Sequence, residues 1–211
     1  GVMAVLGFQT RFMLPCFTVA FVLIIGITNL PTDIYGKYTH LGRGCMYVLA
    51  ALSFSRCGDA WAIDAWWFHQ RKKVQQHESN YAWSRYCVWC AMATIYFSAG
   101  WSKVVTGSAD WLDPGHMRYC LITGLNKIDS NRDLVDQVLQ LPNTTFIALG
   151  LFAIVVEIAY PMVLFSRWAR IFFPLAAAAL HVGIYVLQQI LFLDLILLQL
   201  VFLDPRCLFL G

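Results

Sequence analysis

Long apolar runs separated by short polar stretches form the pattern of this chain. A helix needs about 20 apolar residues to cross the ~30 Å hydrocarbon core of a bilayer. Residues 171–203 form a run of 33 residues whose one charge is Asp194. As a single helix this run would be about 50 Å long, too long for one crossing, so we divide it near Gln188-Gln189. The pattern predicts about six membrane-spanning helices, the last of them short enough that five remain an alternative. They are residues 12–30, which Pro31-Thr32-Asp33 is expected to end, then 38–55, 86–103 and 143–165, and the two parts of 171–203.

The stretch from residue 104 to 141 is more polar, being rich in Asp, Gly and Asn. Ser130-Asn131-Arg132-Asp133 resembles a capping-box start. Apolar residues then recur at helical spacing, at Leu134, Val138 and Leu141, which predicts a short amphipathic helix on the membrane interface. With no internal repeat, the predicted fold class is an all-α integral membrane helical bundle, one transmembrane domain over residues 1–211.

Composition supports the membrane assignment. Of the 211 residues, 59% are hydrophobic and only 13% are charged, whereas a soluble domain has about 25% charged residues. Aromatic residues reach 15% and include eight tryptophans, as expected where rings lie at membrane interfaces. The net charge of +3 is too small to indicate nucleic acid. The expected surroundings are therefore a lipid bilayer and other membrane subunits.

Basic residues are distributed unequally between the two sides of a six-helix topology. One side would hold nine Lys and Arg residues and the other four, and the positive-inside rule places the richer side in the cytosol. Both termini are expected there, or on the equivalent stromal or matrix side of an organelle membrane. The nine are Arg11, Arg56, Arg71, Lys72, Lys73, Arg85, Arg167, Arg170 and Arg206, and the four are Lys37, Arg118, Lys127 and Arg132.

Ionisable residues within the predicted spans are the candidates for chemistry, because each costs about 2.5–3.5 kcal/mol at a membrane centre on insertion scales. In one hypothesis they line a polar pocket in which Lys103 acts as a base and His181 handles a second proton. In the other, which we favour, Arg43 pairs with Glu157 or Asp194 and Lys103 extends to the interface. The candidates are His40, Arg43, Lys103, Glu157, His181 and Asp194.

Other motifs give weaker signals. The C-x-x-C of Cys87 and Cys90 has no second cysteine pair, so we interpret it as two small apolar side chains. Asn143-Thr144-Thr145 is a glycosylation sequon, but it coincides with the expected start of a helix. No histidine in the polar loops has the spacing of a metal ligand, and we predict no metal site.

Two adjacent segments resemble a known family. Residues 96–103 (Tyr-Phe-Ser-Ala-Gly-Trp-Ser-Lys) and 110–115 (Asp-Trp-Leu-Asp-Pro-Gly) are similar to the horizontally transferred transmembrane (HTTM) domain. That family includes the membrane core of vitamin K-dependent gamma-carboxylase. The short acidic segment 55–64, the segment 157–161 (Glu-Ile-Ala-Tyr-Pro) and His181 fit the same pattern in the same order.

The resemblance implies roles for two residues. The carboxylase lysine after Ala-Gly is the base that deprotonates vitamin K hydroquinone, and a late histidine supports the reaction; these roles would fall on Lys103 and His181. A second histidine of the carboxylase has no counterpart here, where Asp59, Trp61 and Asp64 stand instead. The large lumenal domain also has no counterpart in these residues, so we do not expect glutamate carboxylation.

Two hypotheses about function follow. The first is a non-catalytic or accessory subunit of a larger membrane complex, photosynthetic or respiratory, with bound lipids or pigments. The alternative is a membrane enzyme of the carboxylase/epoxidase type, acting on a quinone or lipid with Lys103 as base. The enzyme hypothesis requires a Lys103 that no carboxylate binds. A transporter is disfavoured because 211 residues without a repeat leave little room for alternating access.

Overall fold

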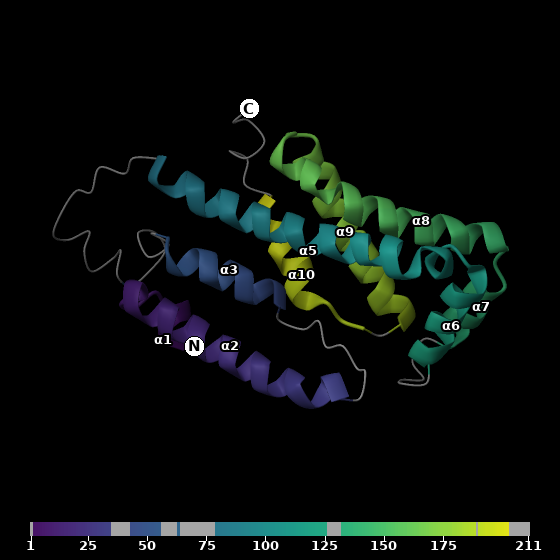
Figure 1. The fold of residues 1–211 in the computed structure, drawn as a ribbon, viewed down its shortest axis with the longest axis horizontal. Helices are drawn as coiled ribbons and strands as arrows, with labels where there is room; N and C mark the ends of the chain where they lie inside the picture. The colour runs from purple at the N-terminus through teal and green to yellow at the C-terminus, as the bar shows by residue number, and fades with distance from the viewer. Residues whose placement is uncertain are drawn as a thin grey trace. The chain divides into compact units, whose positions relative to one another are not determined.

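The computed structural model describes residues 2–34, 43–55, 63, 79–125, 132–188 and 190–202. All regular secondary structure in these ranges is helical, which confirms the all-α fold class (Figure 1). The chain forms two compact units, residues 1–91 and 92–211, and the boundary lies within one helix. A single transmembrane domain over residues 1–211 stays a prediction. The helices are α1 (Val2–Val5), α2 (Thr10–Ile34), α3 (Arg43–Ser53), α5 (Ser79–Trp111), α6 (Pro114–Leu125), α7 (Arg132–Leu139), α8 (Asn143–Ala159), η3 (Tyr160–Leu164), α9 (Ala169–Gln188), α10 (Leu193–Leu198) and η4 (Gln199–Phe202).

In the first unit, α2 packs against α3 through hydroxyl groups. Thr18 Oγ1 donates to the carbonyl of Leu14 at 2.8 Å and lies 2.8 Å from Ser53 Oγ, which in turn donates to the carbonyl of Leu49. Each hydroxyl thus has a partner although the surrounding residues are mostly apolar. The prediction that residues 31–33 end the first helix is wrong, because α2 continues to Ile34. A proline in the last turn removes one backbone donor without ending the helix.

The second unit contains the two helices that are long and apolar enough to cross a membrane among the described residues. These are Asn143–Leu164, formed by α8 with η3, and Ala169–Gln188, which is α9. The first closely matches the predicted span 143–165, and the end of α9 confirms the division at Gln188. The helix that follows, α10, is too short to cross. Within the described residues no other predicted span meets this length and composition, so the number six is not confirmed.

Helix α5 is longer than the sequence pattern predicts. It was expected over 86–103 and extends over Ser79–Trp111, with backbone angles outside the helical range at Gly107 (φ −151°, ψ 24°). The polar stretch after Lys103 therefore begins as a continuation of the helix, which the apolar pattern does not show.

Glycines allow α5 to approach α8 closely (Figure 1). A Cβ added to Gly100 would lie 2.8 Å from the Cβ of Glu157 and 2.9 Å from the backbone nitrogen of Ile158. A Cβ on Gly150 would meet the carbonyl oxygen of Trp111 at 2.0 Å. Small residues at such contacts are typical of helix pairs in membranes. The two glycines therefore set the distance between α5 and α8 at two places, where Gly100 meets Glu157 and Ile158 and where Gly150 meets Trp111.

The polar connection between α5 and α8 folds into α6 and α7. Leu121, Val135 and Phe146 form a small core there. The short helix expected after residue 131 is confirmed, but its predicted apolar face is not: Val135 is the buried residue, whereas Leu134 and Leu141 are exposed and Leu141 lies beyond the helix end. Arg118 holds the connection in place by donating to Asn143 Oδ1 at 2.7 Å and to the carbonyl of Leu141 at 3.0 Å. Its guanidinium also lies 4.3 Å from the centre of the Phe146 ring.

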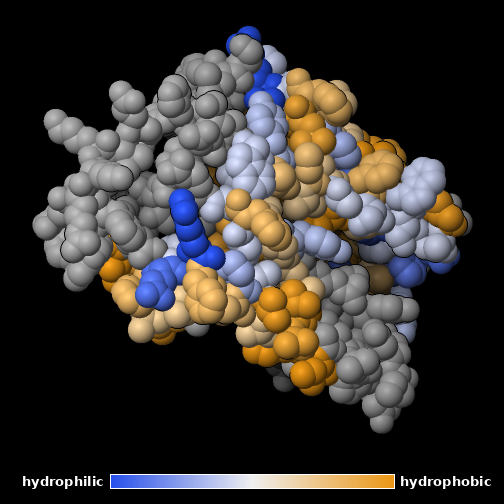
Figure 2. All heavy atoms as spheres, turned by 60° about the vertical axis from the view of Figure 1, so that its left-hand side comes forward, coloured by the Kyte–Doolittle hydropathy of each residue, from blue (hydrophilic) through white to orange (hydrophobic). Residues whose placement is uncertain are grey.

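Polar and apolar residues of the second unit are distributed as expected for a membrane protein. Buried positions include charged and polar side chains, whereas many large apolar side chains of α8 and α9 are exposed. Figure 2 shows apolar patches on the surface among hydrophilic and intermediate residues. Exposed apolar surface of this kind suits contact with lipid or with another protein. The buried polar residues of this unit are Glu157, Arg170, His181 and Gln199, and exposed apolar residues include Ile147, Leu151, Val155, Phe172, Leu175 and Val182.

Candidate functional site

Lys103 of α5 forms an ion pair with Glu157 of α8. The ammonium donates to both carboxylate oxygens, at 2.7 Å to Oε1 and 2.6 Å to Oε2. The Lys103 side chain is 17% exposed and that of Glu157 is 9% exposed, so the pair is largely shielded from solvent. Two short charge-assisted bonds satisfy most of the hydrogen-bonding capacity of the ammonium.

The surroundings of the pair hold Lys103 in this position. Gly100 lies one turn before Lys103 and brings the backbone of α8 close enough for the carboxylate to reach the ammonium. On its other side, Lys103 Nζ lies 4.8 Å from the centre of the Trp111 ring, a cation–π distance. Lys103 Nζ therefore has both a carboxylate and an aromatic ring as close neighbours.

The enzyme hypothesis requires Lys103 without a carboxylate partner, and the structure gives Lys103 such a partner. The favoured alternative paired Arg43 with Glu157 or Asp194 and extended Lys103 to the interface, whereas the structure pairs a largely buried Lys103 with Glu157. Because the Arg43 side chain lies outside the described part of the chain, its partner stays a prediction. His40 also lies outside the described residues. Asp194 stands in the first turn of α10, half-buried.

His181 of α9 lies in a second polar cluster, built from aromatic and amide groups. Its Nε2 lies 2.8 Å from the hydroxyl of Tyr96 on α5. The ring of Tyr96 stacks on that of Tyr160, with 4.2 Å between the ring centres. His181 and Tyr96 are 6% and 2% exposed, so both lie in the core of this unit.

Gln199 of η4 connects the two tyrosines. Tyr160 donates its hydroxyl to Gln199 Oε1 at 2.5 Å, and Gln199 Nε2 donates to the hydroxyl oxygen of Tyr96 at 2.8 Å. The same Nε2 donates to the carbonyl of Leu195 at 3.2 Å. Together Tyr96, Tyr160, His181 and Gln199 form a cluster, here called the tyrosine–histidine cluster.

The cluster has one buried polar atom with no hydrogen-bond partner among the described residues, Nδ1 of His181. The imidazole ring contacts aromatic rings, with centres 5.7 Å from Tyr96 and 5.1 Å from Phe192. Buried polar atoms nearly always have a partner, so this nitrogen requires an explanation.

Sequence analysis missed three members of the cluster. Tyr96 and Tyr160 lie in the segments that carry the HTTM resemblance, but a tyrosine in an aromatic-rich span gives no distinct signal. Gln199 did offer one: it is an uncharged polar residue in a long apolar run, and such a group is costly unless it is hydrogen-bonded. Of the predicted residues, the structure brings Lys103 and Glu157 together and places His181 with Tyr96.

A third pair lies in the polar connection. Cys120 Sγ and His116 Nε2, one turn apart on α6, are 3.6 Å from each other. Burial raises the pKa of the Cys120 thiol, which disfavours the thiolate needed for nucleophilic or metal chemistry. No group of three or more potential metal ligands occurs in the described ranges. We therefore assign this pair no catalytic role.

Comparisons with known protein families, characterised proteins and solved structures find no match to this chain. The HTTM resemblance therefore remains a prediction from short motifs.

Proposed function

We propose that this chain is an HTTM-like integral membrane protein that serves as a non-catalytic, accessory subunit of a larger membrane complex. The observation that carries the non-catalytic part is the ion pair between Lys103 and Glu157. A lysine acts as a base only through the lone pair of its neutral amine. Both contacts of Lys103 Nζ with Glu157 use its hydrogens, so in this arrangement the group is a hydrogen-bond donor to a carboxylate and does not receive a proton from a substrate.

The membrane part of the proposal rests on α8 and α9. Both have the length and apolar composition of a span, and fewer than half of the residues in either are buried within the chain. The core helix of a soluble protein is mostly buried, so this low burial favours lipid or another subunit as the neighbour. Four further spans, partly outside the described residues, would complete the proposed bundle.

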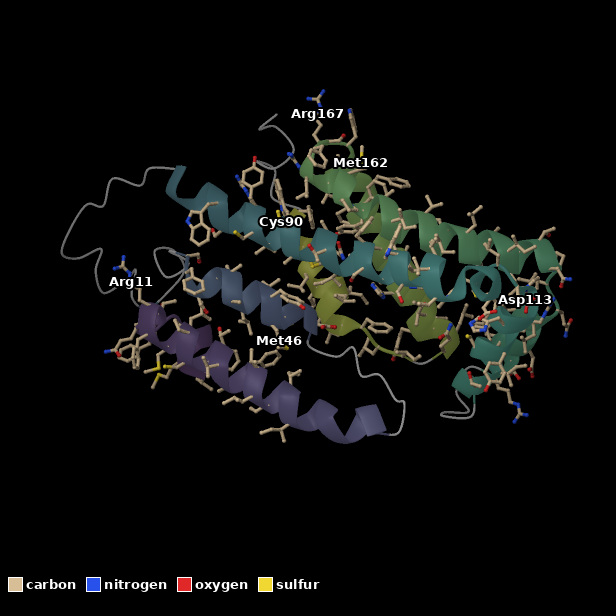
Figure 3. The ribbon with its side chains drawn as sticks, viewed as in Figure 1. Arg11, Met46, Cys90, Asp113, Met162 and Arg167 are labelled. Carbon is tan, nitrogen blue, oxygen red and sulfur yellow. The ribbon has the colours of Figure 1, made fainter. Side chains whose placement is uncertain are left out.

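The charges at the two ends of α8 support the proposed orientation. In Figure 3, Asp113 lies near the start of α8, whereas Met162 and Arg167 lie beyond its other end. Arg167 and Arg170 are the basic residues at that second end, beside the exposed ring of Trp168. By the positive-inside rule, the Arg167 end is cytosolic, stromal or matrix. The six-helix topology puts both termini on the same side.

A second candidate is the membrane enzyme that acts on a quinone or lipid. The partnerless Nδ1 of His181 favours it, because a buried polar atom of this kind offers a contact to a bound molecule. In this candidate Glu157 would first have to release Lys103, by protonation or by movement of its side chain. The two candidates therefore differ in what happens to the ion pair during function.

Gentle detergent extraction followed by size analysis and mass spectrometry tests the proposal. We expect the chain to migrate within a larger complex, and the double variant Lys103→Met/Glu157→Met, which leaves no buried carboxylate without its partner, to enter that complex and leave its activity intact. Arg132→Gln, which removes an exposed positive charge elsewhere, is the control. A chain that migrates alone with a bound quinone, which the double variant loses and Arg132→Gln keeps, would contradict the accessory role and support the enzyme.

A further inference from the structure

The direction of each hydrogen bond in the tyrosine–histidine cluster can be derived from one fixed end. The carbonyl of Leu195 can only accept, so the side-chain atom of Gln199 that lies 3.2 Å from it must be the amino group. This contact fixes the orientation of the Gln199 amide. Its oxygen then faces Tyr160, whose hydroxyl donates to it.

The same amino group has a second hydrogen, which it donates to the hydroxyl oxygen of Tyr96. The hydroxyl hydrogen of Tyr96 is then directed to the remaining neighbour of that group, Nε2 of His181 at 2.8 Å. To accept this hydrogen, Nε2 must have a free lone pair. A neutral imidazole with a free Nε2 has its hydrogen on Nδ1.

The chain of bonds therefore ends in a donor, Nδ1–H of His181, buried and without an acceptor among the described residues. His181 is more than nine-tenths buried, so bulk solvent does not supply that acceptor. The group is held in place by Tyr96 on one side and by the ring of Phe192 on the other.

We infer that Nδ1–H of His181 is the binding site for a neutral hydrogen-bond acceptor oxygen. The oxygen belongs either to a carbonyl group of a lipid-like molecule or to an internal water. A buried water usually has two to four polar partners. The ring contacts of His181 are aromatic, so the carbonyl of an otherwise apolar molecule fits the surroundings better. This inference does not depend on the accessory role, because a structural lipid and a substrate would bind in the same way.

Nitrogen NMR of the full chain with ¹⁵N-labelled histidine, in detergent micelles, tests the inference. The chain has five histidines, and the signals that His181→Phe removes identify the ring. We expect the proton on Nδ1, with a downfield, slowly exchanging N–H signal that indicates a hydrogen bond. A proton on Nε2, or an Nδ1–H signal without a hydrogen bond, would overturn the inference.

A second variant tests the acceptor at Nδ1 without altering His181. Gln199→Leu removes the amino group that donates to Tyr96, so the Tyr96 oxygen becomes free to accept from the imidazole. Tyr96 can still donate to Nε2, and a proton on Nε2 would turn the lone pair of Nδ1 toward the bound oxygen. We therefore expect the proton to stay on Nδ1. A proton that moves to Nε2 in Gln199→Leu would show that the Gln199 amide, rather than an acceptor at Nδ1, decides the tautomer, and would overturn the inference.

The source of the oxygen is determined by two further measurements on the wild-type chain. Magnetisation transfer from water to Nδ1–H would identify an internal water. A carbonyl compound in the organic extract of the purified protein, detected by mass spectrometry and lost in His181→Phe, would identify a lipid-like molecule. Finding neither would contradict the site.

Discussion

Replacing Lys103 by methionine is expected to destabilise the second unit by leaving the Glu157 carboxylate without its partner. At the 2.6 Å between Lys103 Nζ and Glu157 Oε2, two unit charges attract by about 6 kcal/mol at an effective dielectric constant of about 20. Moving both charges out of water costs several kcal/mol per ion, so the net contribution of the intact pair is small. Breaking a buried pair from one side is different and typically costs about 3–5 kcal/mol.

The burial of the two side chains decides where in this range the loss falls. Exposed pairs contribute about 0–1 kcal/mol, but these side chains are only 17% and 9% exposed. We therefore expect Lys103→Met to lower the free energy of unfolding by about 3 kcal/mol, at the lower end of the buried range, because Lys103 keeps some access to solvent. Replacing both residues by methionine should restore it to within about 1 kcal/mol of the wild type.

A double-mutant cycle measures this coupling. The free energy of unfolding is obtained for the wild type, Lys103→Met, Glu157→Met and the double variant by titrating dodecyl sulfate into detergent micelles and following tryptophan fluorescence. Eight tryptophans provide the signal. If the effects of the two single substitutions simply add in the double variant, the ion pair does not form and the argument against Lys103 as a base fails.

Three other substitutions or modifications test separate parts of the structure. Gly100→Ala should lower the free energy of unfolding by about 1–3 kcal/mol, because the new methyl group forces α5 away from α8. Gly183→Ala should not lower it, because no atom lies within 4 Å of the new methyl group. Equal losses of stability for the two variants in the same titration would contradict the close approach of α5 and α8. Arg118→Lys should speed hydrogen–deuterium exchange in residues 139–143, because lysine lacks the guanidinium fork that bonds this connection; unchanged exchange would refute that role. Burial raises the pKa of the Cys120 thiol above its ordinary 9.0, so the folded protein contains less of the reactive thiolate at any lower pH. Mass spectrometry should therefore find that maleimide labels Cys120 slowly in the folded protein and quickly in the unfolded protein. The labelling rate of the folded protein should still increase with pH above 9.0. A labelling rate that levels off at or below 9.0 would contradict this prediction.

The parts of the fold that follow from the sequence are those where one long apolar run decides the structure. Residues 143–165 have no alternative to a helix of spanning length, and the structure has Asn143–Leu164. The division after Gln188 follows from the thickness of a bilayer, because one helix over the whole run would be too long. These predictions depend only on local composition and length.

Features that depend on partners distant in the sequence could not be predicted in this way. Lys103 and Glu157 are 54 residues apart, and nothing local chooses Lys103 over Arg43 as the partner of Glu157. Gly100, whose missing side chain lets the two backbones approach, is what allows Lys103 to reach Glu157. The length of α5 was missed because residues 79–85 and 106–110 contain few large apolar side chains. Pro31 was expected to end α2, but the helix continues to Ile34. The sequence shows that Gln199 needs hydrogen-bond partners, but it does not show which residues they are.

The ion pair and the tyrosine–histidine cluster lie on the same helix yet can be tested independently. Tyr96 and Lys103 are seven residues apart, about 10 Å along α5, and effects of substitutions at such distances usually add. Lys103→Met should therefore leave the tautomer of His181 unchanged, and Gln199→Leu should leave the coupling between Lys103 and Glu157 intact. A loss of the coupling alone would remove the argument for a non-catalytic subunit and keep the acceptor site. A wrong tautomer alone would remove the acceptor site and keep the accessory role, so neither failure can be mistaken for the other.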